Sequence, residues 1–314
     1  MDPLRKNVAL AVDGGGIRGV IVTRALTILE EHLGRPVNSV FRLSAGTSTG
    51  SIISAGIGAG LTARQMHELY VSLGDIIFKK NLQSELWYFF KYRYPHGPLE
   101  AALKKHIGDG VMGDFWSAKP PTDVVITAFD LVENRTRFIK PYKDEWAGWP
   151  ITKAVLASSS VPTFFPPVDG RYVDGGVGAY ANPCYIAAYE AIYCLGWDPA
   201  ETTLISFGTG AIKSGLKPGE ATDFWPWQWL DPVTGAFLQS AYEEQIQVVA
   251  TLFPALDFRR FQVTLRESIG MDAADQIPRL VAYGDEMGRK VLNNETEQIP
   301  SFRAVRMPEQ PPAP

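Results

Sequence analysis

The chain has 314 residues, of which 46% are hydrophobic and 20% are charged, and its formal net charge is −4. This is the composition of a globular protein that is long enough to bury a large core. The acidic balance gives no reason to expect nucleic acid as a partner. We expect one α/β domain over residues 1–306 rather than two independent domains.

The cysteines and the hydropathy of the sequence indicate the compartment in which the protein works. Cys184 and Cys194 fall in one predicted helix, roughly 15 Å apart, which is too far for a disulfide. They form no metal-site pattern, and no run approaches the ~18–20 apolar residues of a spanning helix. No signal peptide is recognisable. We therefore expect a cytoplasmic protein without a metal, which would meet a lipid only by transient contact with a membrane surface.

The first 60 residues predict two strand–helix units. Residues 7–12 form an apolar run typical of a buried parallel strand, and a helix is expected over about 20–33. A second short strand ends near Ala45, and a helix of small residues follows over 51–59. This order is typical of a parallel sheet with crossover helices. The two loops that follow the strands should meet at the sheet edge where open α/β sheets hold their sites.

The rest of the sequence continues to alternate between predicted helices and predicted strands. Helices are expected over 61–73, 99–107, 149–159, 183–195, 241–252 and 274–292, and strands over 123–130, 136–139, 171–174, 202–207 and 260–265. Residues 307–314 are rich in proline and predict a mobile tail. The fold class is therefore α/β with a mostly parallel sheet.

Two stretches are dense in aromatic residues. Residues 85–94 combine aromatic rings with cations, and residues 223–230, within an elaboration at about 213–234, hold Trp225, Trp227 and Trp229. Rings with a polar tip suit a boundary between water and an apolar phase. Each stretch is interpreted either as packing on the body or as a lipid-facing or acyl-binding cover.

A serine lies at the centre of the turn Gly46-Thr47-Ser48-Thr49-Gly50, between the second strand and its helix. A Gly-X-Ser-X-Gly turn in this context is typical of a serine nucleophile. The free amides and the dipole at the start of a helix favour developing negative charge there. Ser48 is thus the candidate nucleophile, although the same pattern could be only a glycine-rich turn.

Acyl transfer also requires donors for an oxyanion. Gly14, Gly15 and Gly16 follow the first strand, and glycines let backbone amides approach a small anion without a Cβ in the way. The amide of Thr49, the residue after the candidate nucleophile, is a further donor.

The proton acceptor is not an obvious histidine. His32, His67, His96 and His106 fall in or near periodic helices rather than in turns that follow strands. Asp174 follows a predicted strand in an Asp-Gly-Gly turn, so we predict a Ser–Asp dyad. A carboxylate with a reference pKa near 3.9 is a weak base. It must therefore lie against the hydroxyl and take the proton during attack.

Taken in order, these motifs resemble the patatin-like phospholipase (lipid acyl hydrolase) family. The matches are Asp13–Gly19, Gly46–Gly50 and Asp174–Gly176, with secondary matches at Ala157-Ser158, Pro162–Pro166, Asn182-Pro183 and Ser206–Gly210. They cover about residues 7–210.

The resemblance implies a three-layer α/β/α fold and a phospholipase or carboxylesterase activity on fatty-acyl esters. It implies Ser48 as nucleophile, Asp174 as its partner, and the loop 14–16 as oxyanion hole, with no metal, calcium or other cofactor. Arg18 matches the arginine of the family's glycine loop, where it could order the loop or contact a polar head group.

Two other classes of protein compete with this interpretation. The spacing Gly14-x-Gly16-x-x-Gly19 also fits a dinucleotide-binding loop, but the second strand ends without the carboxylate that would hold a ribose. A non-catalytic lipid-binding protein would not need Ser48 and Asp174 together.

Overall fold

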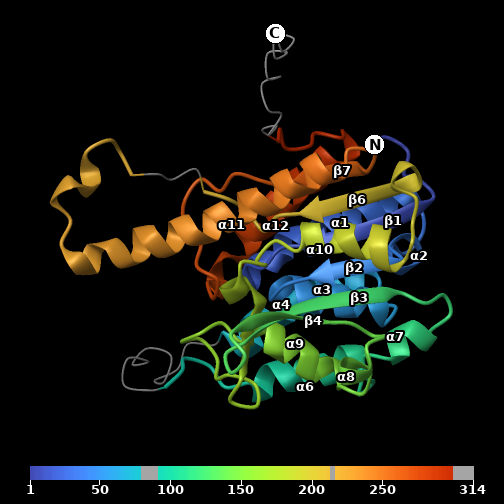
Figure 1. The fold of residues 1–314 in the computed structure, drawn as a ribbon, viewed down its shortest axis with the longest axis horizontal. Helices are drawn as coiled ribbons and strands as arrows, with labels where there is room; N and C mark the ends of the chain where they lie inside the picture. Colours follow the sequence, from blue (N-terminus) through green and yellow to red (C-terminus); the bar gives the residue numbers. More distant parts are fainter. Residues whose placement is uncertain (79–90, 213–215, 300–314) are drawn as a thin grey trace, which may run out of the picture.

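The structure is a computed structural model that describes residues 1–78, 91–212 and 216–299 (Figure 1). Most of the aromatic stretch at 85–94 and all of the tail at 307–314 lie outside the described residues. The strands are β1 (Asn7–Val12), β2 (Leu43–Gly46), β3 (Asp123–Asp130), β4 (Arg135–Ile139), β5 (Tyr172–Asp174), β6 (Thr202–Phe207) and β7 (Asp257–Phe261). The α-helices are α1 (Gly19–Leu33), α2 (Val37–Val40), α3 (Thr49–Gly58), α4 (Ala63–Ile77), α6 (Gly97–Ile107), α7 (Asp114–Ser117), α8 (Asp144–Ala147), α9 (Ile151–Ser159), α10 (Cys184–Tyr189), α11 (Leu230–Leu252) and α12 (Ile277–Leu292).

One mixed sheet runs through the molecule. Its order is β4-β3-β2-β1-β6-β7, and β5 also pairs with β3. The pairs between β3, β2, β1, β6 and β7 are parallel, whereas β4 and β5 lie antiparallel to β3. The prediction of a mostly parallel sheet is therefore confirmed. The carboxyl ends of β1 and β2 lie side by side, because Val12 pairs with Gly46.

Helices cover both faces of the sheet and make three layers (Figure 1). The side chains of β1 point alternately to the two faces of the sheet, and each face is covered by its own set of helices. Val8, Leu10 and Val12 enter one hydrophobic core, which α1, α4 and α12 complete, while Ala9 and Ala11 enter a second core with α10 and α11. After Asn7 the strand is apolar at every position because both of its faces are buried.

The start of α11 differs from the sequence prediction. The helix begins at Leu230 rather than near residue 241. Among its residues whose side chains the structure describes, Ala241 is the first that is buried, and the preceding residues extend beyond the body (Figure 1). Pro232 and Gly235 interrupt the helical pattern in the sequence, but Pro232 is tolerated because it lies in the first turn.

Two other elements also differ from their predicted ranges. The last strand is β7 at Asp257–Phe261 instead of 260–265. The sequence does not show the apolar pattern of a buried strand here, because Arg259 and Arg260 are charged residues that are buried in ion pairs. The helix predicted over 183–195 is α-helical only to Tyr189 and continues as a π-helical turn over Glu190–Cys194.

Candidate active site

Ser48 occupies a sharp turn between β2 and α3. Its backbone has φ 55° and ψ −122°, an unusual conformation for a residue with a side chain. A Cβ at Gly46 would lie 2.1 Å from the carbonyl oxygen of Gly50, and one at Gly50 would lie 2.1 Å from that of Val12. Both positions therefore require glycine, and the turn places Ser48 at the amino end of α3.

Asp174 ends β5 and lies next to Ser48. Its Oδ1 accepts a hydrogen bond of 2.7 Å from the amide of Gly176. Burial raises the pKa of Asp174 to about 6, while the Ser48 hydroxyl and the Gly176 amide favour the carboxylate. Among the described residues no donor completes a hydrogen bond to Oδ2, which is buried. The Ser48 contact is thus looser than a hydrogen bond, which is common at catalytic sites outside the substrate complex.

The glycine loop after β1 lies against Ser48. A Cβ at Gly14 would be 3.2 Å from the Cβ of Ser48. The amide of Gly14 donates to the carbonyl of Ala181 at 2.9 Å, so this predicted oxyanion donor already has an acceptor within the protein. Its role is to let the loop approach the serine.

Three predicted donors keep their amides available. Gly16 is the first residue of a 3₁₀ turn with Gly15 as its N-cap, and Thr49 is the first residue of α3. Amides at the start of a helix have no partner within the helix. Gly15, Gly16 and Thr49 remain the predicted donors to an anion formed beside Ser48.

Arg18 orders the glycine loop. Its Nε donates to the carbonyl of Gly15 at 3.2 Å and its Nη1 to that of Gly210 at 3.4 Å. Burial lowers the pKa of Arg18. These contacts favour the loop-ordering role over contact with a polar head group, because they direct the guanidinium at the protein's own backbone.

A buried ion pair fixes the start of the same loop. Arg260 on β7 donates from Nη2 to Asp13 Oδ2 at 2.5 Å and from Nη1 to Oδ1 at 2.9 Å. Burial raises the pKa of Asp13 to about 6, and the Arg260 guanidinium opposes that shift. The sequence analysis did not identify Arg260. A basic residue 247 positions away carries no local signal of this pairing.

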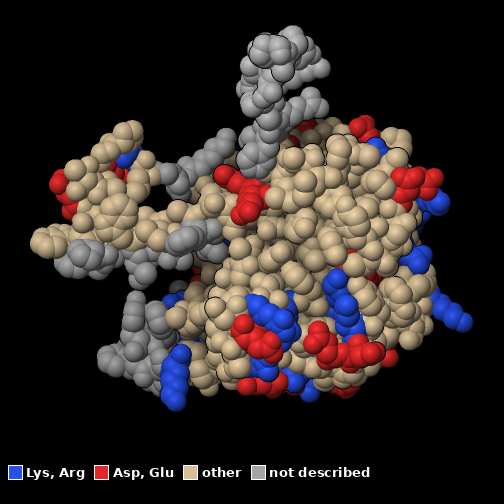
Figure 2. Space-filling model, in the orientation of Figure 1, with Lys and Arg blue, Asp and Glu red and all other residues tan. Residues whose placement is uncertain are grey.

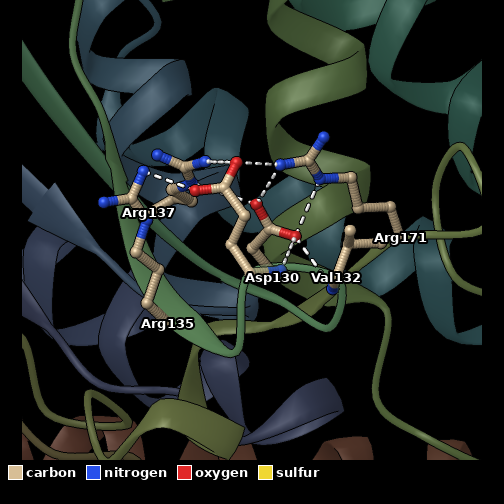
Figure 3. Close-up of polar contacts among 6 residues, drawn as sticks. Asp130, Val132, Arg135, Arg137 and Arg171 are labelled. Atoms are coloured by element: carbon tan, nitrogen blue, oxygen red, sulfur yellow. Dashed lines mark hydrogen bonds and ion pairs between the residues drawn. The ribbon is translucent and has the colours of Figure 1, made fainter.

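A second ionic cluster holds the strand that carries Asp174. Asp130 ends β3 and accepts from Arg171 Nε at 2.7 Å, from Arg171 Nη2 at 2.6 Å and from Arg137 Nε at 3.1 Å (Figure 3). Asp130 also pairs with Tyr172 in the β3–β5 ladder. The pKa of Asp130 is held below its usual range, chiefly by Arg171. The cluster thus anchors β5 two residues before Asp174 begins its turn.

An apolar pocket opens at the serine. It is bounded by Ser48, Thr49 and Ser159 on one side and by apolar side chains from α3, α4, α6 and the segment 161–165, among them Ile52, Leu73, Ile77, Leu99, Phe164 and Phe165. Tyr94, from the aromatic stretch at 85–94, is buried and packs on Phe164 and Phe165. For this residue the core interpretation is confirmed. The pocket has the lining expected of a site for a hydrocarbon chain.

The two half-buried histidines, His67 and His96, have other partners. His96 Nε2 lies 2.9 Å from Ser160 Oγ, and His67 Nδ1 lies 3.1 Å from Thr23 Oγ1. Within residues 1–78, 91–212 and 216–299, no group of three or more His, Cys, Asp or Glu side chains could hold a metal ion. No helix in the described part of the chain is long and apolar enough to cross a membrane.

Residues 10–188, more than half of the chain, match the family described as patatin-like phospholipase. The chain belongs to the patatin-like phospholipase family. It is 31% identical over 223 residues to the "Intracellular phospholipase A2" of Caenorhabditis elegans and 26% identical over 288 residues to the "Calcium-independent phospholipase A2-gamma" of Rattus norvegicus. It is also 26% identical over 234 residues to the "cGAMP-activated phospholipase" of Vibrio cholerae.

These alignments cover 65%, 84% and 67% of this patatin-like chain, but 20%, 36% and 66% of the three relatives. The chain therefore spans about a fifth to two thirds of the relatives it matches. Among solved structures, VipD from Legionella pneumophila aligns with a TM-score of 0.48 at 12% identity, covering 93% of this chain and 67% of that one. The motifs at Gly14–Gly16 and Ser48 and the turn at Asp174 all lie within residues 10–188.

Proposed function

We propose that this chain is a lipid acyl hydrolase that cleaves fatty-acyl ester bonds with Ser48 and Asp174 through an acyl-enzyme. The observation that carries the proposal is the position of a buried carboxyl group beside a strained serine at the mouth of an apolar pocket. The family and the three relatives named phospholipases support the same class of reaction.

In the first step, Ser48 Oγ attacks the ester carbonyl while the acyl chain lies in the apolar pocket. Asp174 Oδ2 accepts the hydroxyl proton, because Oδ1 is already bonded to the Gly176 amide. The amides of Gly15, Gly16 and Thr49 stabilise the oxyanion. The intermediate then collapses, the alcohol leaves with the proton from Asp174, and the acyl group remains on Ser48.

In the second step, water attacks the acyl-enzyme from the open side of the site. Asp174 accepts a proton from that water and returns it to Ser48 Oγ as the fatty acid leaves. A pKa near 6 suits both roles better than the usual value, since the group is mostly ionised at pH 7 yet binds a proton readily.

The test is labelling and hydrolysis with matched serine variants. Ser48→Ala should abolish reaction with a fluorophosphonate probe and lower the hydrolysis of p-nitrophenyl butyrate and of phosphatidylcholine vesicles by at least ~1,000-fold. Ser54→Ala is the control, because Ser54 is also buried in α3 but accepts a hydrogen bond of 2.8 Å from Ser44 Oγ instead of contacting the site. Full hydrolysis by Ser48→Ala would show that the chemistry resides elsewhere.

The aromatic arm, defined here as residues 216–240, supports a proposal for how lipid reaches the site. It projects from the body on the side to which the carboxyl end of β6 points (Figure 1). Trp225 is 63% exposed and Trp229 is 42% exposed, and both signs of charge lie near the tip (Figure 2). Indole rings are favoured at membrane interfaces. The arm would therefore contact the surface of a lipid aggregate.

The helix α11, which carries the end of the arm, also contacts the glycine loop of the site. Tyr242, at the body end of α11, donates to the carbonyl of Gly14 at 3.2 Å. Replacing Trp225 and Trp229 together by alanine should weaken binding to phosphatidylcholine vesicles at least threefold while hydrolysis of soluble p-nitrophenyl acetate stays unchanged. Equal behaviour of the variant and the parent protein on vesicles would refute the interfacial role.

A further inference from the structure

The end of α9 contacts the backbone of both residues of the dyad. Ser158 Oγ accepts a hydrogen bond of 2.9 Å from the amide of Ser48, and Ser159 Oγ donates to the carbonyl of Ser48 at 3.3 Å. The carbonyl of Ser160 accepts from the amide of Asp174 at 3.0 Å. One short segment, Ser158–Ser160, therefore joins two loops that are more than 120 residues apart in sequence.

These contacts are enclosed rather than superficial. Ser158 and Ser160 are fully buried, and Ser159 is 8% exposed. Helix α9 packs on α3, which begins directly after Ser48, and on β5, which ends at Asp174. Within the described residues the hydroxyl of Ser158 is the acceptor found for the amide of Ser48. Loss of that hydroxyl would leave a buried donor without its partner.

The conformation of Ser48 explains why this bond matters. A φ of 55° is unfavourable for a residue with a side chain and persists only when surrounding contacts hold it. The angle φ describes rotation about the N–Cα bond, so the direction of the amide and the position of the side chain are linked. The bond to Ser158 holds the amide, and the Ser51 amide, at 2.9 Å, holds the carbonyl of Ser48.

We infer that Ser158–Ser160 sets the separation between the Ser48 hydroxyl and the Asp174 carboxylate, and that Ser158 is a positioning residue for the reaction. Ser158 acts through the backbone of Ser48 and does not touch the substrate in this scheme. The inference rests on the proposed function. It adds a third element to the site, with the function of keeping the nucleophile at the correct distance from its base.

The experiment compares Ser158→Thr with Ser158→Val. The two side chains have nearly the same shape and add the same bulk, but only threonine keeps a hydroxyl to accept from the Ser48 amide. A displacement of about 1 Å at a reacting group can cost on the order of 100-fold in rate. We therefore expect kcat of the valine variant on p-nitrophenyl butyrate to be about 10- to 100-fold below that of the threonine variant, with KM within about twofold.

A second readout separates positioning from stability. The rate constant for fluorophosphonate labelling of Ser48 should fall in parallel with kcat, whereas Ser54→Ala should lower the melting temperature and leave labelling unchanged. Ser158→Ala adds no bulk and serves if both larger side chains prevent folding; it should label at least tenfold more slowly than the parent protein.

The outcomes distinguish this inference from the function on which it rests. Equal kcat and equal labelling for the threonine and valine variants would overturn the positioning role, provided that Ser48→Ala is inactive. Activity retained by Ser48→Ala would instead reject the proposed function. A change in KM alone would also overturn the inference, because it would indicate an effect on substrate binding.

Discussion

Replacing Asp174 by asparagine removes the carboxylate from the proposed dyad but keeps the size and shape of the side chain. The Asp174 Oδ1 accepts from the Gly176 amide at 2.7 Å, and an asparagine must keep its own oxygen there to preserve that bond. Its NH₂ group then occupies the position of Oδ2, the oxygen that we propose accepts the Ser48 proton. The variant thus presents a donor where the reaction needs an acceptor.

The expected loss of activity follows from the role of a general base. Such a group contributes about 10²- to 10⁴-fold, which corresponds to about 3–5 kcal/mol in the activation barrier. In the parent protein, kcat/KM on p-nitrophenyl butyrate should rise with pH through an apparent pKa near 6, because only the carboxylate of Asp174 accepts the proton. The asparagine variant should lose both the rate and this pH dependence. An asparagine variant with the parent protein's rate, or with its pH profile intact, would refute the dyad.

The same substitution should have the opposite effect on stability. The pKa of Asp174 is raised by burial from 3.8 to about 6, so the native state binds this proton more tightly than the unfolded chain. Proton binding by Asp174 therefore contributes to the free energy of unfolding fully below pH 3.8, and this contribution is lost as the pH rises through 6. Two pKa units correspond to about 3 kcal/mol. Urea unfolding should therefore show the asparagine variant to be more stable than the parent protein above pH 6, by up to about 3 kcal/mol, and similar to it near pH 4.

Three further predictions concern the supports of the site. Arg260→Met leaves Asp13 buried without its cation and should cost about 3–5 kcal/mol in urea unfolding at pH 7, with a smaller loss at pH 5, where Asp13 can be protonated; a loss below about 1 kcal/mol would contradict this. Asp130→Asn removes the negative charge and one of the two acceptor oxygens that Arg171 contacts; because Arg171 is 30% exposed and can be rehydrated, the expected loss is about 1–3 kcal/mol, disappearing only at pH values well below 3.8. Leu73→Trp fills the apolar pocket and should reduce kcat/KM at least tenfold on p-nitrophenyl palmitate but not on the acetate; equal losses on both esters would argue against an acyl pocket.

Local patterns predicted much of the fold because they encode local requirements. The strand at 7–12 matches β1, and the strands at 123–130 and 202–207 match β3 and β6. In each case apolar residues fill both faces of a covered sheet. The capping box of Thr62 with Gln65 likewise lies within a few residues and marks the start of α4. The segments predicted poorly are the start of α11, where Pro232 and Gly235 interrupt the helical pattern, and β7, where buried charge replaces the apolar pattern.

The sequence by itself determined the glycine turns and the candidate dyad of Ser48 and Asp174, because a sharp turn restricts residue type within five positions. Only the tertiary structure decided which groups support them: the Ser158 hydroxyl on the Ser48 amide, Arg260 on Asp13, and the Ala181 carbonyl that occupies the Gly14 amide. The physical reason is that a buried polar group requires a partner of the right kind but not at a given distance along the chain. Any serine, arginine or carbonyl that the fold brings near will satisfy it.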